Sequence, residues 1–523
     1  MPAANTTAVA EVFATIGSMA ISIPYLDPFL YIVAPLFLIL VPWAVRVAGA
    51  SKLPLLNTAG PFGLWERRAR KLFMSRAKDL INKGLQMTDK FRIISDLGEV
   101  IVLHPKYLEE LKNRPELSFS QWSAKAFCAH IPGFEAFKQS TSDDHIFRNV
   151  VQRKLSKSLG DMTQALGDET TTALSEIFTE QSTWHEVTMK PASLLLIARI
   201  SARAFAGPEL GRDPAWIDVT AQYTGAIFAA IRQLKMWPEA LQGWVHWFLP
   251  TCRHLRQQLV EARKIITPVV TRRLAKKREL LAAGKPLGPS TDLIDWMFDL
   301  GKDKQYDPAI LQLVISVAAI HTTSDLLAQV VYHVGKNQEL LKALREEIVA
   351  VLSDGGWKES TFPRLRLMDS VLKESLRLKP SAMVSLRRIA TKDFPLSDGT
   401  MIRKGQTIMV SAGQMMDPEI WLNPTKFDGY RFLRRREQEK QASYQLVSTT
   451  ADHQGFGYGM YVCPGRFFAD HALKVAFCHL LLKYEFEFPQ GAEEPRILEV
   501  GFAYRADPEA KVLFRRRQEE IPL

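Results

Sequence analysis

Cysteine is scarce in this sequence, and no two cysteines stand in a metal-binding pair. Only four occur among 523 residues, at Cys128, Cys252, Cys463 and Cys478. So low a count excludes a small disulfide-stabilised scaffold, and the lack of a CxxC pair argues against a zinc ribbon. A Walker loop and a dinucleotide-binding fingerprint are also missing, so no flavin or NADPH module is expected in the chain.

Internal repeats and low-complexity tracts are absent too. The residues are 47% hydrophobic and 24% charged, as in ordinary globular proteins. This balance excludes a disordered chain, a collagen and a transporter with many membrane spans. The 67 basic residues exceed the 56 acidic ones and give a formal charge of +11, which favours acidic partners or a membrane surface. No recognised nucleic-acid-binding module accompanies this charge, so nucleic acid is not an expected partner.

Residues 28–45 form a run without a charge, close to the shortest length that spans a bilayer. No lysine or arginine precedes the run, whereas Arg46 and Lys52 follow it. The positive-inside rule therefore predicts a lumenal segment at 1–27, a single transmembrane anchor at 28–45 and a cytosolic remainder. A cleaved signal peptide and a buried hairpin of the catalytic domain are the alternatives. A signal peptide would need a basic N-terminal region and a small-residue cleavage site, and the sequence has neither in the right place.

Two further features of the N-terminal part follow from its residue types. Asn5 begins a glycosylation sequon on the predicted lumenal side, which would make the protein a glycoprotein. Prolines and glycines predict a linker at 46–63. The remaining residues, 64–523, have no second break in composition and are predicted to form one large domain.

This domain is predicted to be mainly helical with a small β-rich part. Apolar residues recur at helical spacing in eight stretches: 149–159, 162–181, 193–205, 216–234, 255–281, 310–334, 338–352 and 370–378. Strand-like residues at 91–94 and 100–103 flank a turn and predict a hairpin. Residues 401–402 and 407–410 flank another turn, and 484–488 and 511–514 also have β character.

Cys463 lies in the most informative stretch, FGYGMYVCPGRFFA at 456–469. The glycines allow tight turns and close backbone approach. A helix is predicted at 467–482, with Pro464 at an early helical position, and a helix N-terminus favours a thiolate. A thiolate on a glycine-lined loop has what an axial haem ligand needs. The alternative is that Cys463 is a buried structural cysteine without a ligand role.

The stretch resembles the haem-binding loop of cytochrome P-450 monooxygenases, F-x-x-G-x-R/H-x-C-x-G, at Phe456, Gly459, Cys463 and Gly465. Tyr461 replaces the usual Arg or His, which in the family contacts a haem propionate. Tyr461 can donate one hydrogen bond there, without the charge. By this resemblance Cys463 is the metal ligand, and haem b is the cofactor.

Glu374-Ser-Leu-Arg377 resembles the E-x-x-R motif of the same family. Residues three apart share one helix face, so Glu374 and Arg377 can pair. The family adds an arginine downstream, expected here as Arg431 in the stretch FDGYRF, where Gly429 replaces the usual proline. The resemblance gives this triad a structural role behind the haem. A solvated helix pair is the alternative for the first two residues.

Residues 318–323, AAIHTT, resemble the oxygen-activation motif of the family. Ala318 leaves room above a flat cofactor, and a threonine hydroxyl can bond to the carbonyl four residues back and distort the helix. Thr322 matches the threonine that supports protonation of the iron-bound oxygen. His321 replaces the usual acid; it either carries protons or packs outside the pocket. This form of the motif is similar to fungal enzymes of terpenoid and other secondary metabolism, including ent-kaurene oxidases.

Haem propionates need cationic partners, and two places in the sequence offer them. The segment at 386–393 is similar to the family's propionate-binding strand, with Arg388 the better match and Arg387 the second. The family's W-x-x-x-R helix has no match in this sequence. Arg148, Arg153 and Lys154, which lie about where that helix should be, are the candidates.

The resemblance implies the cytochrome P-450 fold, here preceded by the transmembrane helix predicted at 28–45, and insertion of one oxygen atom from O2. Electrons come from NADPH through a separate NADPH–cytochrome reductase, with cytochrome b5 as a further donor. Microsomal members of the family are single-pass proteins of the endoplasmic reticulum membrane. The arginine runs at 434–436 and 515–517 are candidates for reductase docking or simply solvated surfaces.

Five segments placed by analogy predict a lipophilic pocket: 119–137, 223–234, 314–323, 381–386 and 500–503. They contain Phe127, Phe134, Ile227, Phe228 and Met383. A terpenoid or related secondary metabolite is the expected substrate. A haem-thiolate isomerase or dehydratase, and a membrane-anchored haem or lipid binder, are the alternative functions.

Overall fold

The structure is a computed structural model that describes residues 53–57, 66–140, 146–288, 290–300, 306–439 and 442–522. The predicted lumenal segment at 1–27, the predicted anchor at 28–45 and most of the predicted linker at 46–63 lie outside these residues. Residues 53–57 of that linker lie against the first strand of the main sheet: the Leu56 amide donates to the Arg92 carbonyl over 3.1 Å.

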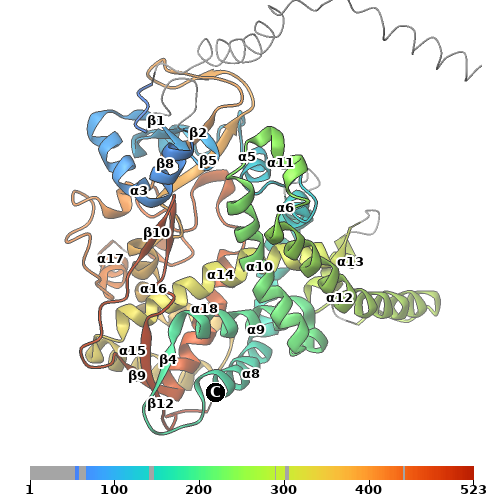
Figure 1. The fold of residues 1–523 in the computed structure, drawn as a ribbon. Helices are drawn as coiled ribbons and strands as arrows, with labels where there is room; N and C mark the ends of the chain where they lie inside the picture. Colours follow the sequence, from blue (N-terminus) through green and yellow to red (C-terminus); the bar gives the residue numbers. More distant parts are fainter. Residues whose placement is uncertain are drawn as a thin grey trace, which may run out of the picture.

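Helices make up most of the described chain; the strands β1, β2, β5 and β8 lie at one end of it and β4, β9 and β12 at the other (Figure 1). The helices are α3 (Glu66–Met87), α4 (Leu108–Leu111), α5 (Phe119–Ala126), α6 (Glu135–Ser140), α7 (Ile146–Arg153), α8 (Leu159–Phe178), α9 (Met189–Leu210), α10 (Pro214–Leu234), α11 (Glu239–Val245), α12 (Pro250–Ala282), α13 (Leu293–Leu300), α14 (Pro308–Val334), α15 (Gln338–Gly355), α16 (Arg366–Leu378), α17 (Arg431–Glu439) and α18 (Arg466–Lys483). The prediction of a mainly helical fold with a small β part is confirmed.

Helix α14 runs through the middle of the molecule (Figure 1). The Asp307 side chain caps it by accepting from the amides of Ala309 and Ile310, and Pro308 suits the first turn because its missing N–H costs nothing there. Helices α9, α10 and α12 pack against it. It is long and apolar enough to cross a membrane, yet 72% of its most apolar window is buried inside the protein, as in the core helix of a globular domain.

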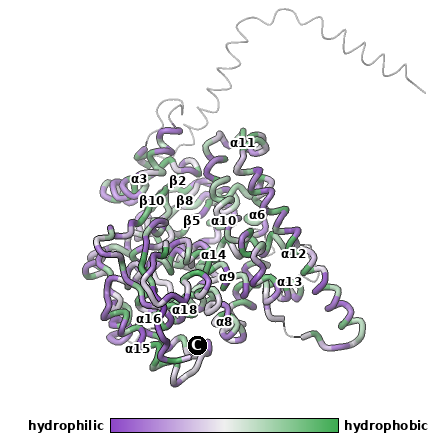
Figure 2. The backbone as a smooth tube through the Cα atoms, turned by 60° about the horizontal axis from the view of Figure 1, so that its bottom comes forward, coloured by the Kyte–Doolittle hydropathy of each residue, from purple (hydrophilic) through white to green (hydrophobic). Residues whose placement is uncertain are grey.

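Helix α12 combines a packed part with a projecting part. Its buried residues all lie between Cys252 and Val270. The remaining turns reach away from the body of the molecule and carry both hydrophilic and hydrophobic residues (Figure 2). Burial of the first part against α10 and α14 anchors the whole helix.

The main sheet has five strands in the order β1-β2-β8-β5-β3. Their bounds are β1 (Lys90–Ser95), β2 (Gly98–Leu103), β3 (Leu117–Ser118), β5 (Val384–Ala390) and β8 (Thr407–Ser411). The predicted hairpin at 91–103 is confirmed as the antiparallel pair β1 and β2. Strand β8 pairs parallel to β2 and antiparallel to β5.

The other strands form three smaller sheets. They are β4 (His185–Thr188), β12 (Lys511–Arg516) and β9 (Tyr484–Glu487) in one sheet, β10 (Leu498–Val500) with β11 (Ala503–Arg505), and β6 (Phe394–Pro395) with β7 (Met401–Ile402). The predicted β character at 484–488 and 511–514 is confirmed, since β9 and β12 pair antiparallel.

Two predicted elements differ in the structure. The helix expected at 149–159 is broken: α7 ends at Arg153, a short 3-10 turn covers Leu155–Lys157, and α8 begins at Leu159. The strands on either side of the 403–406 turn belong to different sheets, because β7 pairs with β6 whereas β8 joins the main sheet. In both cases apolar spacing marks the residues, but tertiary pairing decides the boundary.

Candidate haem-binding site

The loop that carries Cys463 is folded tightly by its own backbone. The Cys463 amide donates to the Phe456 carbonyl over 2.8 Å, and the Val462 amide donates to the Gly459 carbonyl over 3.1 Å. Gly457 and Gly459 have φ of +79° and +77°. A Cβ on Gly459 would lie 2.6 Å from the Lys112 carbonyl oxygen, so only glycine fits there.

This loop rests on the segment that follows α4, a contact that the sequence did not predict. The Met460 amide donates to the Asn113 side chain over 2.8 Å, and Arg148 of α7 donates to the Met460 carbonyl over 2.9 Å. Tyr458 donates to Glu109 over 2.8 Å. No local sequence pattern signals these contacts, because more than 300 residues separate most of the partners.

The Cys463 side chain is half-buried three residues before α18. Burial raises the pKa of the Cys463 thiol above its ordinary value, while the backbone of Gly465 and Arg466 and the charge of Arg466 lower it. Burial wins, so the helix N-terminus alone does not produce the expected thiolate. A bound metal ion deprotonates such a thiol outright. Pro464 lies in the turn before α18 rather than in its first helical turn.

One face of α14 is open although the helix is otherwise largely buried. Ala318 and Thr322, one turn apart, are both exposed, whereas Val317, Ile320 and Thr323 are buried. The Thr322 hydroxyl donates to the Ala318 carbonyl over 2.8 Å, as the sequence predicted. The exposed face therefore borders a space, and α18, which follows the Cys463 loop, packs against the same helix.

His321 points away from this face. A backbone hydrogen bond links its ring to Ala221 of α10, and its Nε2 atom is buried without a partner among the described residues. Burial and, secondly, the charge of Lys190 lower the pKa of His321 to about 4. The ring is therefore neutral near pH 7, and of the two readings of His321 its position favours packing outside the pocket.

Arg388 is buried beside Tyr461. Its guanidinium lies 4.3 Å from the Tyr461 ring centroid and 5.3 Å from that of Phe119. Its one hydrogen bond runs to the carbonyl of Arg387 over 2.7 Å, and it forms no ion pair within the described residues. Burial lowers the pKa of Arg388 to about 10. Tyr461 thus supports the arginine through its ring.

Of the other three cations considered for this role, Arg148 comes nearest to Tyr461. Its guanidinium lies 6.0 Å from the Tyr461 ring centroid. Lys154 is instead 3.9 Å from Asp299. Arg153 is the last residue of α7. The geometry therefore favours Arg148 as a second cation beside Arg388.

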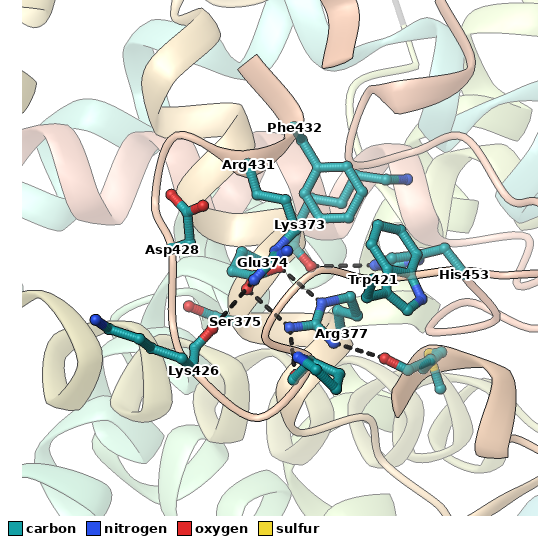
Figure 3. Close-up of polar contacts among 12 residues, drawn as sticks. Lys373, Glu374, Ser375, Arg377, Trp421, Lys426, Asp428, Arg431, Phe432 and His453 are labelled. Atoms are coloured by element: carbon teal, nitrogen blue, oxygen red, sulfur yellow. Dashed lines mark hydrogen bonds and ion pairs between the residues drawn. The ribbon is translucent and has the colours of Figure 1, made fainter. Parts of the chain in front are cut away.

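The three residues of the predicted triad meet in a buried cluster behind this loop (Figure 3). Glu374 accepts two bonds from Arg377, each of 2.8 Å, and one from Arg431 of 2.9 Å. Glu374 and Arg377 are fully buried. The arginines also donate to main-chain carbonyls between Met415 and Lys426, so the triad fixes the loop between β8 and α17.

Gly429, which stands where the family has proline, fills a tight place. A Cβ there would lie 2.9 Å from Leu340 and 3.1 Å from Val371. Its carbonyl accepts from the Ser370 hydroxyl of α16 over 2.6 Å. Close backbone approach explains a small residue at this position.

The predicted wall segments pack on α14 or on one another. Helices α6 and α10 pack on α14, and α5 packs on β5. Met383 donates its amide to the Phe502 carbonyl over 2.8 Å. Phe127 stacks on Phe137 at 4.0 Å and meets Phe228 edge-on at 6.2 Å. Phe134 and Ile227 are fully buried and belong to the core.

These residues fit a haem with a thiolate ligand. The glycine loop gives a flat ring access to Cys463, and the open face of α14 leaves room above such a ring. The Arg388 guanidinium, which lacks a carboxylate partner within the described chain, has the charge that a propionate needs.

Comparison with known proteins identifies the family. The family model for cytochrome P450 matches residues 220–514. Cytochrome P450 monooxygenase 1 of Gibberella fujikuroi is 44% identical over 437 residues, which are 83% of this chain and 99% of that protein. Cytochrome P450 monooxygenase hepE of Aspergillus oryzae is 41% identical over 90% of this chain and 87% of that protein, and adrA of Penicillium rubens is 40% identical over 90% and 93%. The chain belongs to the cytochrome P450 family, and the prediction of a haem-thiolate monooxygenase resembling fungal members is confirmed.

Proposed function

We propose that this protein inserts one oxygen atom from O2 into a lipophilic secondary metabolite, with a terpenoid scaffold as the first class to test. The observation that carries the proposal is the pairing of the Cys463 loop with the open Ala318–Thr322 face of α14. Haem, when bound, supplies the oxygen chemistry, and the protein supplies its ligand, its anchors and the substrate pocket.

In this proposal Cys463 is the iron ligand, and the Phe456–Gly465 loop brings it to the ring. Gly459 and Gly465 keep the backbone close, and Phe456 packs against the core beside them. Arg388, supported by Tyr461, holds one propionate. Glu374, Arg377 and Arg431 keep the loop behind the cofactor in place.

Thr322 is the proton-handling residue of this proposal. Its hydroxyl lies on the open face and now donates to the Ala318 carbonyl, so its oxygen remains free to accept from water or substrate. Replacing Thr322 by valine keeps the shape and removes the hydroxyl. We expect NADPH oxidation to continue while product per NADPH falls at least tenfold, because proton transfer by a placed group contributes about 10²–10⁴-fold.

The substrate pocket is proposed to be apolar and aromatic. Phe127, Phe137 and Phe228 supply flat faces near α14, and Met383 adds a flexible side chain. Such a lining favours a large hydrocarbon scaffold over a polar one. This supports the terpenoid class without selecting a member of it.

Electrons are proposed to come from a membrane-bound NADPH–cytochrome reductase, with cytochrome b5 as a second donor. Most arginines of the two runs already pair with acidic residues of this chain, which weakens the support for reductase docking at these runs. Arg435 lies 3.8 Å from Asp452, and Arg436 lies 3.5 Å from Asp369. The run at 515–517 pairs with Glu485, Glu180, Glu519 and Glu520. Docking at either run remains a prediction.

We also propose that the protein sits on the endoplasmic reticulum membrane. Support comes from an exposed apolar patch around α11: Met236, Trp237, Leu241, Trp244, Trp247 and Phe248. Trp244 and Phe248 are 76% and 77% exposed. Tryptophan and phenylalanine on a short helix are typical of a membrane interface.

The position of this patch agrees with the predicted anchor. Lys235, at the end of α10, lies 3.1 Å from Asp96 in the β1–β2 turn, and Arg70 of α3 donates to its carbonyl over 2.9 Å. Both views place α11 at the same end as this hairpin, against which residues 53–57 lie (Figures 1 and 2). Chain entering from a membrane anchor would thus bring the patch toward the bilayer.

The membrane proposal is tested with the full chain in vesicles that contain lipids brominated on the acyl chain. We expect quenching of tryptophan fluorescence that diminishes in Trp244→Phe and Trp247→Phe but not in Trp357→Phe, whose ring packs on Phe362 inside the protein. Equal quenching in all variants would contradict the proposal.

The proposed reaction is tested by incubating the purified protein with reductase, NADPH, a terpenoid panel and ¹⁸O2. One labelled oxygen per product is expected. Product formed without reductase and O2 would instead indicate an isomerase or dehydratase. Ligand binding with no product would indicate a haem or lipid binder.

A further inference from the structure

A β-bulge in β5 points three consecutive side chains in different directions. Ser385 pairs with Val410 and Arg388 with Ile408, so Leu386 and Arg387 together face one residue of β8. Leu386 has a φ of +48°, which a non-glycine residue rarely adopts. Bulges re-aim side chains and occur next to functional sites.

The three side chains reach different surroundings. Leu386 joins the apolar cluster under β2 and β8. Arg388 lies over Tyr461 and Phe119. Arg387 lies over Trp122 of α5, with its guanidinium carbon 4.8 Å from the ring centroid. The bulge at Leu386 and Arg387 therefore precedes two neighbouring arginines whose guanidiniums lie over different rings.

Arg387 has no acidic partner. Within the described chain its guanidinium makes no ion pair and no side-chain hydrogen bond, and its ring contact with Trp122 is its one polar interaction. Burial lowers the pKa of Arg387 to about 10, and the distant charge of Asp96 opposes this only weakly. Asp96 itself is paired with Lys235 at 3.1 Å.

The side chain is half-buried, so part of it still borders open space. A guanidinium with five N–H donors and no acceptor is costly in such a place. One ring contact offsets only part of that cost. An anion beside this guanidinium would offset the remainder.

Two other cations, Arg388 and Arg148, lie 4.3 Å and 6.0 Å from the Tyr461 ring centroid and would serve the two haem propionates. Arg387 instead lies at the end of an aromatic row. Trp122 meets Phe127 at 5.8 Å, and Phe127 continues to Phe137 and Phe228. An anion at Arg387 would therefore carry an apolar body.

We propose that Arg387 binds the carboxylate of a lipophilic acid, whose apolar body lies along Trp122 and Phe127. This inference rests on the proposed function, since it names the substrate class of the same pocket. The planar fork of arginine matches both oxygens of a carboxylate. The substrate is then an acid on a hydrocarbon scaffold, and an oxidase or hydrolase that produces a carboxylate must act before this enzyme.

The test compares lipophilic acids with their neutral esters. Abietic acid and dodecanoic acid are titrated against their methyl esters by calorimetry, with the haem-loaded full chain. We expect each acid to bind about 10- to 100-fold more tightly than its ester, because hydrogen bonds to charged groups discriminate by that amount. Equal binding of acid and ester, or binding of neither, would overturn the inference.

Two variants of Arg387 test whether this residue causes the preference for acids over esters. Arg387→Met keeps length and apolar contact, and it should abolish the acid preference while haem content stays unchanged. Arg387→Lys keeps the positive charge but lacks the planar guanidinium that binds both carboxylate oxygens, so it should lose most of the preference for acids. This variant replaces Arg387→Met in the test if the methionine variant does not fold. Arg403→Met is the control, because Arg403 is exposed and paired with Asp393 in a surface turn.

Other outcomes separate this inference from the proposed function. Haem loss in Arg387→Met, measured by the pyridine haemochrome, would make Arg387 a propionate anchor and overturn the inference. An unchanged acid preference in that variant would overturn it as well. Calorimetry needs neither reductase nor O2, so it tests the binding of acids independently of the reaction. A preference for acids without any oxygenated product would contradict the proposed function but would still support this inference.

Discussion

At the level of single residues, the buried charges of Glu374, Arg377 and Arg431 stabilise the loop between β8 and α17. Glu374 is fully buried and accepts hydrogen bonds from both Arg377 and Arg431. Taken from water, each of these charges would be costly alone, and together they satisfy one another and several main-chain carbonyls. Residue chemistry therefore stabilises a loop that has little secondary structure of its own.

The change Glu374→Gln removes the negative charge and keeps the shape of the side chain. Two buried guanidiniums lose their counterion, so we expect the free energy of unfolding to fall by about 3–5 kcal/mol and haem content to fall with it. Urea denaturation and the haem-to-protein ratio measure the two effects. Glu437→Gln, on an exposed position of α17, is the control and should change neither.

Some of these residues could be predicted from the sequence and others could not. The spacing of Glu374 and Arg377 on one helix face foretells their pair, and Thr322 bonds to Ala318 because both lie on one helix. The neighbours of Met460 and Tyr458 come from distant residues 109–113 and 148, which no local pattern reveals. The opposing effect of burial, which raises the pKa of the Cys463 thiol, follows from the fold and could not be predicted from the local sequence.

Among helices and strands, too, some features could be predicted from the sequence and others could not. The β1–β2 hairpin and seven of the eight expected helices follow from apolar periodicity, with boundaries set by caps such as Asp307; the eighth, expected at 149–159, is broken. The bulge at Leu386 and the separation of β7 from β8 depend on which strands pair, and pairing is a property of the whole sheet. Predicting the element is therefore easier than predicting its neighbours.

The haem loop as an element depends on its contact with the segment after α4. Gly459→Ala would place a Cβ 2.6 Å from the Lys112 carbonyl oxygen at a φ of +77°. We expect the loop to shift, thermal stability to fall and haem to dissociate faster. Haem transfer to apomyoglobin measures the last effect.

Gly491→Ala is the matched control for this loop. Gly491 has a φ of +75° but nothing within 4 Å of its would-be Cβ, so it carries the backbone strain alone, about 1–2 kcal/mol. Equal haem dissociation rates in the two variants would show that the Lys112 contact does not hold the loop.

At the scale of the whole molecule, several histidines are buried and uncharged. Burial is the largest cause that lowers the pKa of His321 to about 4 and those of His333, His471 and His479 to about 3. Between these values and the ordinary pKa of 6.5, the unfolded chain binds protons that the folded chain does not. Stability is therefore lost as the pH falls through this window.

We expect the free energy of unfolding to fall by several kcal/mol between pH 7 and pH 4.5. Urea midpoints at pH 7, 6 and 5 measure this slope. His479→Gln should reduce the slope by up to one proton, because its ring is buried next to Thr171 and Trp357. A midpoint independent of pH over this range would contradict the account.

The most direct measurement is the absorption spectrum of the purified protein, reduced and bound to carbon monoxide, beside Cys463→Ala. The account predicts a thiolate-type Soret band in the wild type and its loss in the variant, since Cys463 alone among the four cysteines lies on the glycine loop. A band typical of histidine-ligated haem in freshly folded wild type, or a thiolate-type band that survives in Cys463→Ala, would contradict it.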